Sequence, residues 1–212
     1  MNLMQKWSRR LPWLAIPNLM LYLVAGKAIL WLLVMFGDSR IYSLLTLTRA
    51  QLFQGQIWRL FTFIFVPPIQ FQPLFLVLEL YFLYWIGNAL EQYWGAGPFT
   101  LYILCGMVGS WVSCLLVGAA NDQWMFYALF FAFAWLFPQV QVLLFYVIPV
   151  KVQWLGWASA ALLLLQFLGM TMAAKLGLFL GLAGFWLVFG TQAGTRYKDW
   201  KRRREWQNQW RR

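Results

Sequence analysis

The 212-residue chain contains no histidine. A serine hydroxyl becomes a nucleophile at neutral pH only beside a base, and histidine is the usual base. Every hydrolytic mechanism built on a histidine base is therefore excluded. A serine–lysine pair is the alternative, but neither Ser110 nor Ser159 has a basic neighbour in the sequence.

Charged residues are also scarce, at 11% of the chain, whereas 62% of residues are hydrophobic and 20% aromatic. A soluble domain cannot bury that much apolar surface, so the composition predicts a polytopic membrane protein. The formal net charge of +11 is concentrated at the two ends of the chain. We therefore expect the basic residues to bind anionic lipids rather than nucleic acid.

Only two cysteines are present, Cys105 and Cys114, nine residues apart in one apolar run. They face different sides of a helix, so they are expected to pack rather than to form a disulfide. No cofactor or metal ion is predicted. No cleavable signal peptide is predicted either, because the first apolar run reaches spanning length without a small-residue cleavage site.

Six apolar runs are long enough to cross a bilayer as helices. We place them at residues 13–36, 71–90, 99–118, 124–148, 154–171 and 174–190. Within the fourth, Pro138 either kinks or ends the helix, and the apolar run from Val142 to Ile148 could continue it. The turn between the second and third spans is expected over 92–98.

An even number of spans puts both termini on one side, and the excess of basic residues there predicts the cytoplasm. Residues 1–12 form a basic amino-terminal segment, and 191–212 form a basic, tryptophan-rich tail expected to lie on the inner leaflet. A docking site for a cytosolic partner is the alternative for the tail. The residues assigned to the membrane surface are Lys201, Arg202, Arg203, Arg204, Trp206 and Trp210.

The loop at 38–70 interleaves apolar residues with arginine and glutamine, which is typical of an amphipathic segment in the membrane interface. It contains the pair Trp58-Arg59. The next span then carries Gly87, Glu91 and Gly95 at spacings of four. One helix face therefore has two positions without a side chain and one carboxylate.

These motifs resemble the rhomboid superfamily, and the local sequence is similar to its derlin branch, whose members are not proteases. The resemblance implies an all-α, rhomboid-like bundle of six transmembrane helices with a membrane-embedded first loop. Its scaffold positions would be Trp58, Arg59, Glu91, Gly177 and Gly181. The two span-six glycines are expected to let that helix approach a neighbour closely, with span four the favoured one.

The same resemblance places Gln123 at the catalytic serine and Ala174 at the catalytic histidine, and Phe75 and Glu79 at the positions that serve the oxyanion. Lys175 follows Ala174 and points about 100° away from it on a helix. We therefore expect a protein that is not an enzyme. Asp122, Gln123 and Glu79 would make the vestigial cavity hydrophilic.

Lys27 and Glu79 are the only charges deep in the predicted spans, and each is costly alone. Both lie about 13 Å below the outer boundary if each residue adds ~1.5 Å. Equal depth and opposite sign predict a pair between the first two spans. It would either lock these helices together or offer a polar notch to a client helix.

The predicted function is that of a derlin-like pseudoprotease, which binds transmembrane clients and thins the bilayer during quality control or retrotranslocation. A membrane protease or an AAA ATPase is a candidate partner, although no ATPase-recruiting motif is found in the tail. A transporter or channel component and a structural subunit of a membrane complex are the alternatives. The sequence favours the bacterial plasma membrane, with the endoplasmic reticulum as the alternative.

Overall fold

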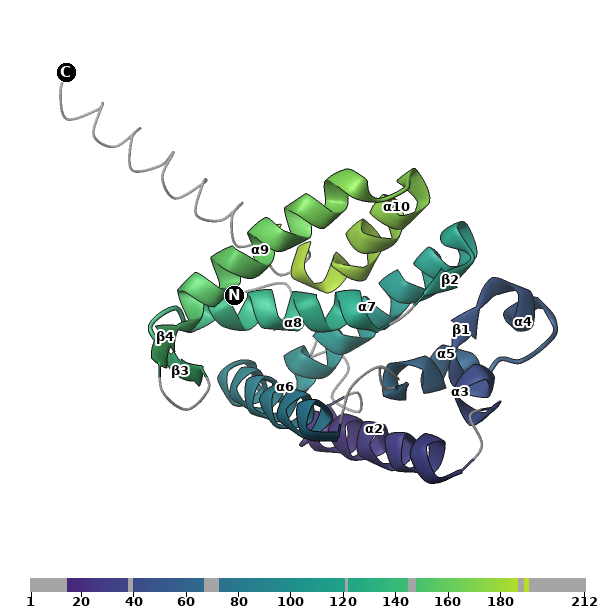
Figure 1. The fold of residues 1–212 in the computed structure, drawn as a ribbon, viewed down its shortest axis with the longest axis horizontal. Coiled ribbons are helices and arrows are strands. Elements are labelled where there is room, and N and C mark those ends of the chain that lie inside the picture. Colours follow the sequence, from purple (N-terminus) through teal and green to yellow (C-terminus); the bar gives the residue numbers. More distant parts are fainter. Residues whose placement is uncertain are drawn as a thin grey trace, which may run out of the picture.

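The computed structural model describes residues 15–37, 40–66, 73–120, 122–144, 148–186 and 189–190. The described chain is mostly helical (Figure 1). The predicted amino-terminal segment 1–12 and the tail 191–212 lie outside the described residues. The predictions made for them, including the lipid-binding residues of the tail, are therefore not tested.

Four helices are long and apolar enough to cross a membrane, which supports the predicted class of helical membrane protein. They are α2 (Leu19–Phe36), α6 (Pro73–Trp94), α7 (Ala96–Val117) and α9 (Val152–Gly169). Two further apolar helices are shorter, namely α8 (Gln123–Leu136, 14 residues) and α10 (Met172–Gly181, 10 residues). Residues 183–186 and 189–190 are also helical.

The turn between α6 and α7 is much tighter than predicted. Helix α6 continues to Trp94 and α7 begins at Ala96, so Gly95 alone separates them. Gly95 has φ 88°, a left-handed value that a residue with a Cβ rarely adopts. The predicted turn over 92–98 is therefore present but is reduced to a single glycine.

The predicted fourth span is also wrong in its second half. Helix α8 ends at Leu136, and the apolar residues that follow form the antiparallel hairpin of β3 (Gln141–Leu144) and β4 (Ile148–Lys151). Pro138 lacks the N–H that a continuing helix would need. The following β-branched residues favour strands, and apolarity alone could not distinguish the two outcomes.

The first loop consists of short helices, none long enough to span a bilayer. They are α3 (Arg40–Leu45), α4 (Arg49–Phe53), α5 (Arg59–Thr62) and the 3₁₀ turn η2 (Phe63–Phe65). Between them, β1 (Leu47–Thr48) pairs antiparallel with β2 (Ala119–Ala120), which links the loop to the turn between α7 and α8. These distant segments of the chain therefore share one end of the molecule (Figure 1).

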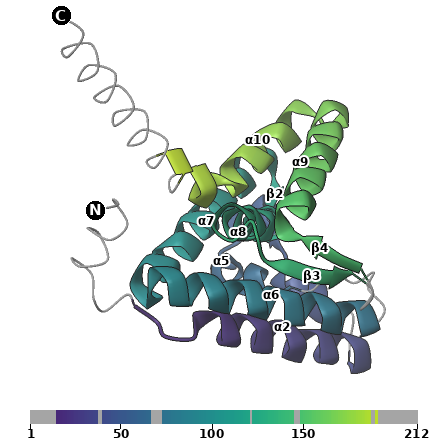
Figure 2. The ribbon, with the colours of Figure 1, turned by 90° about the vertical axis from the view of Figure 1, so that its left-hand side faces the viewer.

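Helices α2 and α6 lie side by side in one layer (Figure 2). Helix α8 contacts α6 and also α9 and α10, so it joins this layer to the carboxy-terminal helices. The main neighbour of α10 is α7, not span four as predicted. A Cβ on Gly109 of α7 would clash with the backbone oxygen of Leu180, which shows how closely the two helices approach.

The two span-six glycines face different helices. Gly177 lies against Ser113 of α7, and Gly181 lies against Trp124 of α8. The expectation that small residues allow close helix packing is therefore met at both positions. Only Gly181 contacts the predicted neighbour.

Candidate functional site

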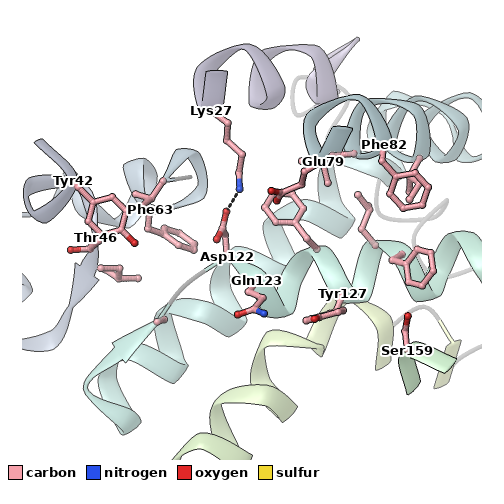
Figure 3. A pocket seen from close by; sticks show the side chains of 18 residues that line it. Lys27, Tyr42, Thr46, Phe63, Glu79, Phe82, Asp122, Gln123, Tyr127 and Ser159 are labelled. Carbon is pink, nitrogen blue, oxygen red and sulfur yellow. Dashed lines mark ion pairs between the residues drawn. The ribbon is translucent and has the colours of Figure 1, made fainter. Parts of the chain in front are cut away.

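A cavity of about 650 Å³ lies where the first loop meets the helices α2, α6, α8 and α9 (Figure 3). Its polar lining includes Lys27, Glu79, Asp122 and Gln123. Gln123 is exposed and Glu79 is half-buried, so the cavity reaches the molecular surface. The remaining wall is largely aromatic and aliphatic, with Phe63, Phe82, Phe126, Tyr127 and Phe130 supplying rings.

Two of the lining residues, Lys27 and Asp122, form an ion pair. The Lys27 ammonium lies 2.5 Å from Oδ2 of Asp122, and Lys27 is only 2% exposed. The same ammonium sits 4.4 Å from the centre of the Phe126 ring. Burial raises the pKa of the Asp122 carboxyl, and the neighbouring Lys27 ammonium opposes that rise.

The predicted pair of Lys27 with Glu79 is therefore corrected. Glu79 lies on the same cavity and faces the pair, but the ion pair is made by Asp122 (Figure 3). Asp122 lies outside the predicted spans, whereas Lys27 and Glu79 lie within them. Asp122 lies in the turn before α8, and the pairing of β1 with β2 holds that turn against the bundle.

Glu79 is left without a comparable partner. Its Oε2 atom is buried and makes no hydrogen bond to any of the described residues. The two carboxylates and one ammonium at this site sum to one negative charge when all are ionised. Within the described ranges, Glu79 is therefore a cavity carboxylate with no cation at ion-pair distance.

The four predicted vestigial positions do not come together. Glu79 and Gln123 line the cavity, whereas Phe75 and Ala174 are not among its lining residues. Phe75 is 52% exposed on α6. Ala174 is on α10, whose next turn packs against α7 through Gly177.

A serine and a lysine that are far apart in the sequence share the cavity. Ser159 of α9 and Lys27 of α2 both line it. The Lys27 ammonium is held by Asp122, and a protonated amine in an ion pair cannot accept a proton. The other lysine considered, Lys175, places its ammonium 5.2 Å from the centre of the Phe167 ring and is not part of the cavity lining.

Arg59 organises the loop that closes one side of the cavity. Its guanidinium is 1% exposed and donates to the carbonyl oxygens of Ser43 and Thr46, at 2.6 and 2.7 Å, and to Oε1 of Gln56 at 2.7 Å. The adjacent Trp58 is half exposed and donates its indole N–H to the carbonyl of Leu44. The Trp-Arg pair thus ties α5 to the preceding part of the loop.

The second predicted motif joins α6 to α2. Gly87 leaves room for Met20, and Oε1 of Glu91 accepts a hydrogen bond of 2.6 Å from the backbone N–H of Asn18. Asn18 is the residue before the first turn of α2, a helix with no acidic residue in that turn. Glu91 therefore supplies an acceptor and a negative charge at the amino-terminal end of α2.

Cys105 and Cys114 are both free in the structure, and Cys114 is fully buried. This confirms that they do not form a disulfide.

Comparison with protein-family models, with curated proteins and with solved structures found no match for this chain. The resemblance to rhomboids and derlins therefore stays a prediction.

Proposed function

We propose that this protein binds single transmembrane helices of client proteins at the cavity, without cleaving them, as a derlin-like pseudoprotease would. The observation that carries the proposal is a cavity that combines buried charges with aromatic walls inside a membrane protein. Such a site stabilises a polar group that lipid would not. Glu79 and Phe82 of α6 and Ser159 of α9 border it, so a helix arriving from the lipid could present a side chain between these elements.

Binding without cleavage is supported by the chemistry of the side chains. The chain has no histidine, and the cavity lysine is engaged by Asp122. Ser110, the other serine considered, is buried on α7 and is not among the cavity-lining residues. No described serine has a neutral base beside it, which is what nucleophilic attack on a peptide bond requires.

Local thinning of the bilayer is supported by a short helix. Helix α8 extends about 21 Å at ~1.5 Å per residue, whereas a hydrocarbon core is about 30 Å thick. An apolar helix that is too short is accommodated by a thinner bilayer around it. A thinner bilayer lowers the cost of moving a client's polar residue.

Arg59 and Glu91 support a derlin-like protein. Both belong to the motifs that resemble the rhomboid superfamily, and both make hydrogen bonds that hold the fold together. Ala174 adds no support because it does not line the cavity. The proposed setting is membrane-protein quality control or retrotranslocation, in the bacterial plasma membrane or the endoplasmic reticulum. Anionic lipids and a membrane protease or AAA ATPase are the proposed partners.

Site-specific photocrosslinking tests the proposal with a matched pair on one helix. Phe82 lines the cavity, whereas its neighbour Tyr81 is 67% exposed and does not. A photoreactive phenylalanine analogue at 82 should trap single-span proteins in native membranes, and the same analogue at 81 should trap mainly lipid. Equal protein capture at both positions would contradict cavity binding.

The same experiment addresses the alternatives. A single constant partner captured at Phe82 would favour a structural subunit of a membrane complex. A transporter or channel is favoured by the buried charges of Lys27 and Asp122 and by the half-buried Glu79, since ionisable groups at depth often mark ion pathways. Ion flux through liposomes containing the purified protein, lost in Glu79→Gln, would support that function instead.

A further inference from the structure

We propose that the cavity is selective for a cationic side chain, namely an arginine or lysine within the membrane span of a client helix, with Glu79 as its counter-ion. This inference rests on the proposed client-binding function and specifies what the site recognises. It is carried by the arrangement of charges around the cavity and by the chemistry of its walls.

The charges already present favour a positive ligand. Lys27 is bound by Asp122 at 2.5 Å, so its charge is satisfied by an oxygen that points at it. Glu79 faces the same cavity with a buried oxygen that has no hydrogen-bond donor among the described residues. A ligand that donates hydrogen bonds and carries a positive charge completes this site, whereas an anion would meet two carboxylates.

The walls favour the same ligand. Phe82, Tyr127 and Phe130 line the cavity, and aromatic faces attract ammonium and guanidinium groups. The structure already contains one such contact, because the Lys27 ammonium lies 4.4 Å from the centre of the Phe126 ring. The site can therefore surround the stem of a long basic side chain with rings while Glu79 binds its head.

The depth of Glu79 suits a residue inside a membrane span rather than one at its end. Glu79 is six residues after Pro73, the first residue of α6, which corresponds to about 9 Å along the helix. A basic residue at that depth in a free client helix is costly in lipid. Binding to the cavity removes that cost, so such helices should be held preferentially.

Binding of model helices to the full-length protein in nanodiscs tests this inference. Three labelled single-span peptides would differ at one position, about two turns below the outer boundary, where they carry arginine, leucine or glutamate. The wild-type protein should bind the arginine peptide about tenfold more tightly than the leucine peptide, as expected for one charge-assisted contact. In Glu79→Gln this preference should fall to near unity.

Two controls make the result specific. Glu91→Gln removes one negative charge from a described residue that is not among the cavity-lining residues, keeps an acceptor oxygen for the backbone N–H of Asn18, and should keep the arginine preference. Glu79→Lys should reverse the preference, so that the glutamate peptide binds more tightly than the arginine peptide.

The outcomes distinguish the two proposals. Equal binding of the arginine and leucine peptides to wild type would overturn the charge selectivity and leave client binding in place. An arginine preference that survives in Glu79→Gln would overturn the assignment to Glu79. Failure of all three peptides to bind would overturn the proposed function itself.

Discussion

At the scale of single residues, the Arg59 side chain joins separate parts of the first loop. Its three hydrogen bonds to Ser43, Thr46 and Gln56 are all 2.7 Å or shorter. Arg59→Lys keeps the positive charge but loses the planar set of N–H donors of the guanidinium, so at least one carbonyl should lose its donor. We expect a loss of about 2 kcal/mol, since hydrogen bonds to charged groups contribute roughly 1.5–3 kcal/mol each.

Thermal unfolding in detergent measures this loss, and Arg49→Lys is the matched control. Arg49 is exposed, and its side chain donates to the carbonyl of Leu115 at 3.2 Å, a longer hydrogen bond than any of the three that Arg59 makes. Its replacement should therefore leave the melting temperature almost unchanged. Equal shifts for the two variants would show that Arg59 does not organise the loop.

The ion pair of Lys27 and Asp122 gives a second prediction at this scale. Lys27→Met or Asp122→Asn alone leaves one buried charge unpaired, which typically costs about 3–5 kcal/mol. The double variant removes both charges and should recover much of that loss. Thermal unfolding of the two single variants and the double variant measures the coupling.

A second double variant tests the pair of Lys27 with Glu79 that the sequence predicted. Lys27→Met combined with Glu79→Gln leaves Asp122 buried without its cation, so little recovery is expected. Full recovery in this variant and none in the variant with Asp122→Asn would restore Glu79 as the partner of Lys27.

These residues also show what sequence can predict at this scale. The presence of Lys27 and Glu79 in apolar runs indicates a polar site because isolated charges in lipid are costly. The choice of partner depends on the turn before α8, which the two-residue pairing of β1 with β2 positions. No periodicity in the sequence indicates that pairing, so Asp122 could not be assigned.

At the scale of helices and strands, glycine positions explain how closely α7 and α10 pack. A Cβ on Gly109 would lie 2.0 Å from the backbone oxygen of Leu180, and backbone cannot move aside as a flexible side chain can. Gly109→Ala should therefore separate the helices and lower the melting temperature by several degrees, an effect of about 1–3 kcal/mol for overpacking.

Gly169→Ala is the control for this prediction. Gly169 is the last residue of α9, and nothing lies within 4 Å of a Cβ placed there. Alanine also favours helix by about 1 kcal/mol over glycine. The control should keep or raise the melting temperature, and a similar loss in both variants would contradict close packing as the cause.

Apolar runs predicted the long helices well because α6, α7 and α9 need little beyond length and hydrophobicity to form in a membrane. They failed for 138–151, where Pro138 ends α8 and a hairpin replaces the expected helical continuation. Length and hydrophobicity alone do not separate a buried strand from a helix segment.

At the scale of the whole molecule, the described helices support a polytopic membrane protein, whereas the number of crossings depends on α8 and α10. Both are apolar but shorter than a bilayer, so composition alone cannot assign them as spans. The positive-inside rule predicted the orientation from the basic ends of the chain, which lie outside the described residues. Orientation is therefore best tested at exposed positions within the described bundle.

Four exposed residues, in two pairs, are suitable for such a test. Gln54 lies in the first loop and Ala119 in β2, and the pairing of β1 with β2 puts these segments at one end. Gln92 is near the carboxyl end of α6, and Gln141 begins β3 beyond the carboxyl end of α8. If α6 and α8 both cross the membrane, the second pair lies on the opposite side from the first.

Single cysteines at these four positions, in a background with Cys105 and Cys114 replaced by alanine, would be treated with an impermeant maleimide on intact cells. We expect labelling at 54 and 119 before lysis and at 92 and 141 only after it, because the basic hairpin residue Lys151 should remain cytoplasmic. Labelling of 141 together with 119 would show that α8 does not cross.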